Sequence, residues 1–149
     1  MNNYETVIKA SDQLSAQELI NLLKARTKVF VVEQNCPYQE VDDKDNDAVH
    51  VFFKKGNQIL AYARIVPFDQ TYMSVGRVLV VKEFRQHKLG RQIFAAAINE
   101  LTQRFPNKDI KIQAQSYLKN FYGSFGFKAV SDLYLEDGIS HVDMVLQNQ

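Results

Sequence analysis

The alternation of strand-like and helix-like segments constrains the fold of this 149-residue chain more than any other feature. Two segments carry clear helical patterns. Ser15-Ala16-Gln17-Glu18 is a capping box, and the helix that it opens is predicted to run to about Phe30. Gly90 to Phe105 places apolar residues on one face of a second helix, which Pro106 ends.

Shorter runs rich in β-branched and aromatic residues account for most of the remaining chain. The predicted strands are residues 4–9, 48–53, 58–66, 73–81, 110–114, 130–135 and 141–146, and a third, short helix is predicted over residues 116–125. The resulting order βαβββαβαββ indicates one α/β domain over residues 1–149 with a mixed sheet. The composition agrees, because 46% hydrophobic and 23% charged residues are close to globular averages.

Composition and charge exclude several classes of partner. Eighteen Lys and Arg against 17 Asp and Glu leave a net charge of +1, whereas a nucleic-acid-binding protein needs a clear basic excess. The longest apolar run, Ile93 to Ile98, is too short for a membrane span of about 20 residues. With Cys36 as the only cysteine and no secretion signal at the start, a cytoplasmic setting is expected. The oligomeric state is left open, a homodimer included.

A basic turn between a predicted strand and a predicted helix is the strongest candidate for chemistry. Residues 82–91 contain four Lys or Arg and one Glu, which gives a local charge of +3. Backbone N–H groups at a helix N-terminus bind anions, and basic side chains nearby strengthen that binding. The turn is therefore predicted to hold phosphate groups, with a solvated basic loop as the alternative.

The same turn resembles the acyl-CoA-binding motif of the GNAT acetyltransferases, Gln/Arg-x-x-Gly-x-Gly/Ala. Arg85 stands first and Gly90 last, while Lys88 replaces the middle glycine and disfavours a positive φ there, so an altered loop geometry is expected. The resemblance implies that the loop amides bind the CoA pyrophosphate and that the preceding strand pairs with pantetheine. The implied acetyl-CoA-binding residues are Val78, Leu79, Val80, Arg85, Gln86, His87, Lys88, Leu89, Gly90, Arg91 and Gln115.

A second motif follows downstream, because residues 115–127 resemble the family's Asn-x-x-Ala-x-x-Φ-Tyr-x-x-x-Gly-Phe, where Φ is apolar. Tyr122 falls on the tyrosine that usually lies beside the CoA sulfur, which implies that its hydroxyl protonates the departing thiolate. Gln115 replaces the frequent Asn, and Leu118 replaces the Ala. A lone tyrosine would more simply be a packed aromatic residue, but two motifs in the right order favour a catalytic one.

Two further segments resemble the small ElaA-like branch of the GNAT proteins, residues 26–38 with Asp42, Asp45 and His50, and residues 136–141 with Met144, so the resemblance covers nearly the whole chain. The resemblance implies a single GNAT-like domain whose mixed sheet is mostly antiparallel and flanked by helices. A Val-Phe…Glu…Asp…Asp…Arg pattern that ends at Arg64 is also similar to acyl-homoserine-lactone synthases, although the tryptophan usual in those enzymes is missing. An acyl-homoserine-lactone-type acyltransferase and a catalytically silent acetyl-CoA-binding regulator are the alternatives.

Residues 33–47 form an acidic connector with six acidic residues and one lysine. This charge predicts either a negative wall that attracts an amine or an ordinary solvated loop. The spacing Asp43-x-Asp45-x-Asp47 imitates the start of a calcium loop. However, Ala48 and Lys54 stand where that loop needs Gly and Glu, so no metal is expected.

The predicted reaction is transfer of the acetyl group of acetyl-CoA to an amine acceptor, a small molecule or a peptide amine, in a ternary complex. A strongly basic amine must lose a proton before it attacks, so the site needs a base. Glu33 and His50 are the candidate bases, since they flank or follow the acidic connector. A backbone N–H of residues 78–80 would polarise the thioester carbonyl. The sequence does not identify the acceptor.

Overall fold

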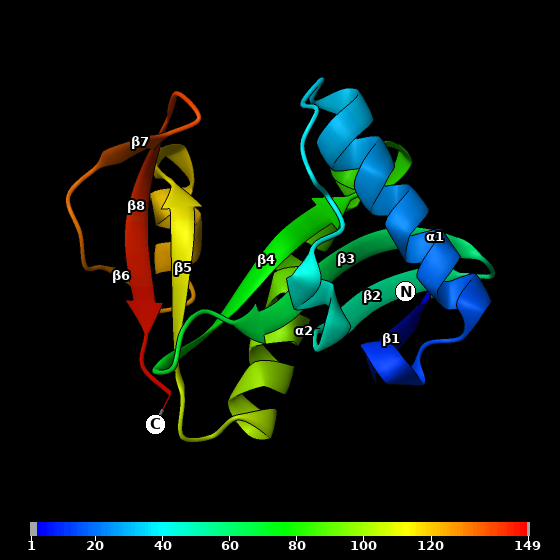
Figure 1. The fold of residues 1–149 in the computed structure, drawn as a ribbon, viewed down its shortest axis with the longest axis horizontal. Coiled ribbons are helices and arrows are strands. Elements are labelled where there is room, and N and C mark those ends of the chain that lie inside the picture. The colour runs from blue at the N-terminus through cyan, green and yellow to red at the C-terminus, as the bar shows by residue number, and fades with distance from the viewer. Residues whose placement is uncertain (1–2, 149) are drawn as a thin grey trace.

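Eight strands form one sheet in the computed structural model, which describes residues 3–148 (Figure 1). The strands are β1 (Glu5–Ala10), β2 (Val49–Lys55), β3 (Gln58–Pro67), β4 (Tyr72–Val80), β5 (Asp109–Gln115), β6 (Lys128–Ala129), β7 (Tyr134–Glu136) and β8 (Ile139–Leu146). Their order is β1-β2-β3-β4-β5-β8-β6, and β7 also pairs with β8. Every described pair is antiparallel except β4 with β5, which confirms the mixed, mostly antiparallel sheet.

Helices flank the sheet on both faces. α1 (Ala16–Thr27) lies in front of β2 and β3 in Figure 1, and α2 (Leu89–Arg104) lies behind the sheet. The short helix α3 (Lys119–Gly123) follows β5, and its aromatic residues join the core on the side of α2. The predicted α/β fold class is therefore confirmed.

Strand alternation sorts the core into two clusters, one on each face of the sheet. On the α1 face, Leu22 of α1 packs with Phe52 and Tyr62. On the α2 face, Ile93 and Phe94 of α2 lie in the larger cluster with alternate residues of β2 to β5 and β8. Burial of these apolar side chains is the main driving force for packing the two helix layers onto the sheet.

Helix α1 begins as the sequence predicts and ends differently. The backbone N–H of Glu18 donates to the Ser15 hydroxyl at 3.0 Å, and the Glu18 carboxylate accepts from the Ser15 N–H at 2.9 Å. The α-helix ends at Thr27, not near Phe30, and continues as the π-helical segment η2 (Lys28–Glu33). The wider turn brings Glu33 to the end of this helical layer, beside the basic turn.

Strands β4 and β5 pair only at their beginnings. The register joins Tyr72 to Asp109 and Met73 to Ile110, although β4 continues to Val80 and β5 to Gln115. Figure 1 shows the two strands diverging beyond this point. We call this divergence the β4–β5 split, and it leaves the facing edges of both strands without a ladder partner.

A bulge in β4 accompanies the split. The register between β3 and β4 shifts between Tyr62 and Arg64, opposite the segment that contains Arg77. Arg77 has a φ of +51°, which is unusual for a residue with a side chain. Bulges bend a strand and increase its twist, so this bulge helps to turn β4 away from β5.

The last hairpin is shorter than predicted. β7 covers Tyr134–Glu136 instead of residues 130–135, and β8 begins at Ile139. The backbone N–H of Asp143 donates to the Ser131 hydroxyl at 2.9 Å, where a longer β7 would offer a backbone carbonyl. A side-chain acceptor therefore interrupts the strand pairing at its far end.

No helix within residues 3–148 is long and apolar enough to span a membrane. The same residues contain no group of three or more His, Cys, Asp or Glu side chains arranged to hold a metal ion.

Candidate active site

The predicted phosphate-binding turn lies between the end of β4 and the start of α2. Residues Lys82–His87 form the 3₁₀ turn η4, and Lys88 precedes the helix. Lys88 has φ +59° and ψ +25°, so the left-handed conformation favoured by glycine is kept here despite the side chain. Its side chain is exposed, which leaves the ammonium free to approach an anion.

The N-terminus of α2 has free hydrogen-bond donors. No side chain among residues 3–148 caps this 16-residue helix. The first N–H groups of a helix have no partner within the helix, and the helix dipole makes that end positive. The arrangement therefore suits the binding of an anion at Leu89, Gly90 and Arg91.

Two arginines of the turn make contacts that fix its neighbours. The Arg85 Nε donates to the carbonyl oxygen of Val80 at 2.9 Å, and its Nη2 lies 2.5 Å from Glu33 Oε1. The Arg91 Nη1 donates to the Ser124 hydroxyl at 2.9 Å and joins the start of α2 to the segment after α3. Gln86 and His87 are exposed, as are both arginines. The basic side chains thus surround the uncapped helix end.

Tyr122 of α3 lies on the α2 face, shortly after the end of β5. Its ring packs edge-on against Phe94 with a centroid distance of 5.2 Å. Burial, followed by the neighbouring Tyr117, raises the pKa of the Tyr122 hydroxyl. The hydroxyl has no hydrogen-bond partner among the described residues, so it is available to a ligand. Gln115, the last residue of β5, is half-buried.

His50 is sealed inside the structure. His50 is only 1% exposed. Its Nε2 lies 2.8 Å from the Ser11 hydroxyl, and its Nδ1 lies 2.5 Å from the Tyr62 hydroxyl. Burial lowers the pKa of His50 to about 4. Both ring nitrogens are thus occupied, and these contacts argue against His50 as the base for an incoming amine.

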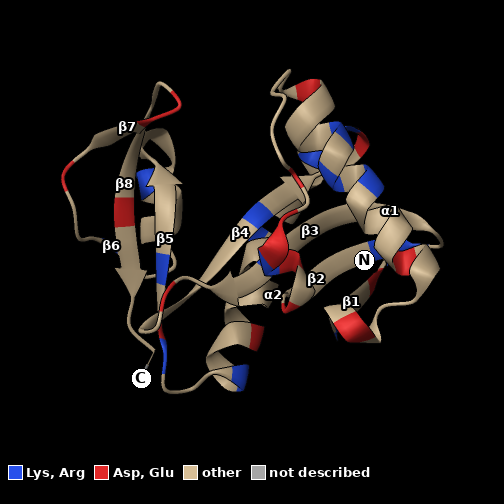
Figure 2. Cartoon of the chain, in the orientation of Figure 1, with Lys and Arg blue, Asp and Glu red and all other residues tan. Residues whose placement is uncertain are grey.

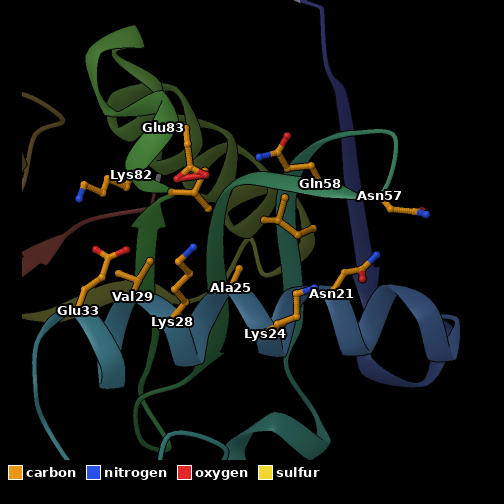
Figure 3. Close-up of a pocket in the computed structure, with 12 residues that line it drawn as sticks. Asn21, Lys24, Ala25, Lys28, Val29, Glu33, Asn57, Gln58, Lys82 and Glu83 are labelled. Atoms are coloured by element: carbon orange, nitrogen blue, oxygen red, sulfur yellow. The ribbon is translucent and has the colours of Figure 1, made fainter.

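Glu33 lies at the end of η2 and is held by Arg85. It also borders a pocket of about 420 Å³ between α1 and the start of η4. Figure 3 shows Lys24 and Lys28 on one side of this pocket and Lys82 on the other. Of the predicted site residues, only Glu33 lines this pocket, so it is distinct from the β4–β5 split.

The predicted negative wall of the acidic connector is wrong, because arginines of the domain body neutralise it. The pairs are Arg26 with Glu40 at 2.6 Å and Asp45 at 2.7 Å, Arg64 with Asp42 at 2.8 Å, and Arg77 with Glu40 at 3.1 Å. Figure 2 shows the acidic turn in front of the sheet, beside a basic position of β4. The connector is therefore a segment on the α1 face that ion pairs hold against the domain.

Sequence reasoning missed Arg26 and Arg77 as the partners of these acids. A signal existed for Arg26, because it lies one helical turn after Leu22 on the buried face of α1. A charge on an apolar face requires a buried counter-charge, and Arg26 is 0% exposed. Arg77 gave no such signal, since its role depends on the bulge.

Comparison with known proteins finds relatives in sequence and in fold. The family model described as "Acetyltransferase (GNAT) domain" matches residues 10–148. The protein ElaA of Escherichia coli is 42% identical over 136 residues, which cover 89% of each chain. The crystal structure of E. coli ElaA superposes with a TM-score of 0.88 over 97% of this chain and 99% of that one, at 38% identity.

Two further solved structures are similar. An acyl-CoA N-acyltransferase from Pseudomonas aeruginosa gives a TM-score of 0.89 at 38% identity, covering 95% of this chain and 98% of that chain. The CoA-dependent acyl-homoserine lactone synthase BjaI gives a TM-score of 0.80 at 15% identity, covering 97% and 84%. At that identity BjaI shares the fold alone.

Proposed function

This chain belongs to the GNAT acetyltransferase family, and we propose that it transfers the acetyl group of acetyl-CoA to an amine by direct attack in a ternary complex. The observation that carries the proposal is the β4–β5 split beside the uncapped N-terminus of α2. The split offers strand edges to an extended chain, and the helix end offers N–H donors to a diphosphate. Cytoplasmic location is part of the proposal, consistent with the exposed Cys36 thiol.

The acetyl-CoA site extends along β4 and into the basic turn. The backbone of Val78, Leu79 and Val80 pairs with pantetheine along the free edge of β4. The diphosphate lies at the start of α2, where the left-handed Lys88 turns the chain into the helix. Gln115 borders the same space from β5. The side chains of Arg85 and Arg91 complete the charge around the diphosphate.

Tyr122 protonates the departing thiolate. Its free hydroxyl lies on the α2 face, and its raised pKa keeps it protonated at neutral pH until the thiolate forms. A backbone N–H of residues 78–80 hydrogen-bonds the thioester oxygen as it gains negative charge. Of the two bases predicted from the sequence, Glu33 is the more accessible, and its use requires release from Arg85.

The direct test measures free thiol release from acetyl-CoA with a panel of amines, amino acids and peptide N-termini. We expect turnover with one class of amine and a loss of roughly 10²- to 10⁴-fold in Tyr122→Phe, with acetyl-CoA affinity kept. Tyr117→Phe, which removes the hydroxyl of an exposed tyrosine of the same motif, serves as the matched control. Binding of acetyl-CoA without thiol release for any amine would identify a silent regulator instead. Turnover only with S-adenosylmethionine would identify the acyl-homoserine-lactone alternative.

A further inference from the structure

The α1 face of β5 and β8 carries polar side chains and has no covering helix among residues 3–148. Ile112 and Ala114 of β5 belong to the core on the α2 face, so the alternate residues Gln113 and Gln115 belong to the α1 face. Figure 1 shows no helix in front of β5 and β8, whereas α1 covers β2 and β3. This open face is the side from which a second substrate can approach the split.

His141 lies on this open face at the end of the split. Its cross-strand partner is Gln115, and residues directly opposite in a sheet share a face. Five residues beyond the parallel pair of Met73 with Ile110 lie Val78 and Gln115. His141 therefore borders the open end of the split, one strand beyond β5, where β4 has already turned away from β5.

The tautomer of His141 is fixed by the backbone. Its Nδ1 lies 2.7 Å from the carbonyl oxygen of Ile139, and a carbonyl can only accept, so Nδ1 carries the proton. In the neutral ring Nε2 then has a free lone pair. Nε2 has no hydrogen-bond partner among residues 3–148, although the residue is only 8% exposed. A nearly buried imidazole with an unused acceptor is the form that a general base needs.

We propose that His141 is the general base of this enzyme, an inference that rests on the proposed acetyl transfer. His141 Nε2 takes the proton from the amine as the N–C bond forms at the thioester carbonyl. The C–S bond then breaks, and Tyr122 gives its hydroxyl proton to the sulfur. The imidazolium passes its proton to solvent, and the phenolate is reprotonated. Base and acid thus act from opposite faces of the sheet.

A carboxylate and an aromatic ring lie next to the His141 imidazole. Glu136 Oε2 lies 3.9 Å from Nε2 and is 49% exposed on its side chain, and the Tyr134 ring stacks on the imidazole at 6.0 Å. Further along the same face, Asp143 accepts from the Tyr134 hydroxyl at 2.5 Å, and Lys111 lies 3.9 Å from Asp143. The carboxylate nearest to Nε2 is therefore Glu136.

The test is the kinetics of His141→Gln with a weakly basic amine that is neutral across the pH range used. We expect kcat to fall roughly 10²- to 10⁴-fold, while the acetyl-CoA dissociation constant and the melting temperature stay close to wild type. The fall of kcat toward low pH, caused by protonation of the base, should disappear. Ser140→Ala is the matched control, because Ser140 precedes His141 on β8 and faces the other side.

A second variant keeps the imidazole and does not depend on how His141→Gln folds. Glu136→Gln removes the carboxylate beside Nε2, so kcat should fall, by less than in His141→Gln, while the acetyl-CoA dissociation constant stays unchanged. Full activity and an intact acid limb in His141→Gln would overturn the inference and leave acetyl transfer standing. Absence of thiol release by the wild type with every amine would instead remove the proposed function, and the inference with it.

Discussion

His50 links three parts of the fold by hydrogen bonds, from Ser11 through its own ring to Tyr62. Burial lowers the His50 pKa from 6.5 to about 4. Between these two pH values the unfolded chain is protonated at His50 and the folded chain is not. Stability should therefore fall as the pH drops through this window. The expected loss is on the order of 3 kcal/mol of unfolding free energy, as an upper bound.

Urea unfolding of wild type and His50→Gln at several values between pH 7 and pH 4 measures this loss. The variant should be less stable at pH 7, and its stability should depend less on pH across the window. Asp45, whose pKa Arg26 lowers against the effect of burial, also loses stability toward pH 4, but this loss is common to the two proteins and cancels in their comparison. Equal slopes in the two proteins would show that His50 does not titrate as its burial requires.

Glu33 and the diphosphate compete for Arg85. The ion pair must open before the Arg85 guanidinium can contact phosphate, and exposed pairs of this kind contribute roughly 0.2–1 kcal/mol. Glu33→Gln should therefore tighten CoA binding by about 1.4- to 5-fold in calorimetric titration. Glu83→Gln removes the same charge from the exposed turn without releasing Arg85. An equal gain in both variants would assign the effect to general electrostatics.

At the level of single residues, local sequence motifs identified candidate site residues, but they did not identify the residues that contact one another across the fold. Tyr122 and the basic turn are recognisable because their spacing forms local motifs. The pairing of the acidic connector with Arg26, Arg64 and Arg77 is not local, since it depends on how three elements meet in space. The fixed tautomer of His141 is equally invisible in sequence, because it depends on the Ile139 carbonyl in a tight hairpin.

Among the elements, the turn before α2 carries backbone strain at Lys88, whose φ is +59°. A left-handed residue with a side chain costs about 1–2 kcal/mol relative to glycine, which is partly offset because glycine gains about 0.4–1 kcal/mol of unfolded-state freedom. Lys88→Gly should therefore stabilise the fold by about 0.5–1 kcal/mol in urea unfolding. Lys88→Ala keeps the Cβ and should not stabilise. Equal stabilisation by the Gly and Ala variants would show that the lysine charge, and not the left-handed backbone, destabilises the turn.

Element types followed from local patterns, whereas element ends did not. The Ser15 capping box fixed the start of α1, but the π-helical continuation to Glu33 has no signal in residue spacing. The split of β4 from β5 follows from the bulge at Arg77 and from only two parallel pairs, which are tertiary features. The shortening of β7 depends on Ser131, whose hydroxyl replaces a strand partner.

On the scale of the whole molecule, the β4–β5 split can be reached from both faces of the sheet, and the two faces offer different side chains. The α2 face contributes Tyr122 and the uncapped helix end, which suit the thioester and the diphosphate. The open α1 face of β5 and β8 contributes His141, which suits the amine. The acids of the connector that border this side are paired with arginines, so we do not expect the connector to attract a cationic amine over a long range.

The crystal structure of the protein with CoA bound tests the central claim most directly. We predict electron density for pantetheine between β4 and β5 along Val78–Val80, with the diphosphate at the first turn of α2 and its oxygens near Arg91. Density for the diphosphate in the pocket of Lys24, Lys28 and Lys82, with the β4–β5 split empty of pantetheine, would contradict the account.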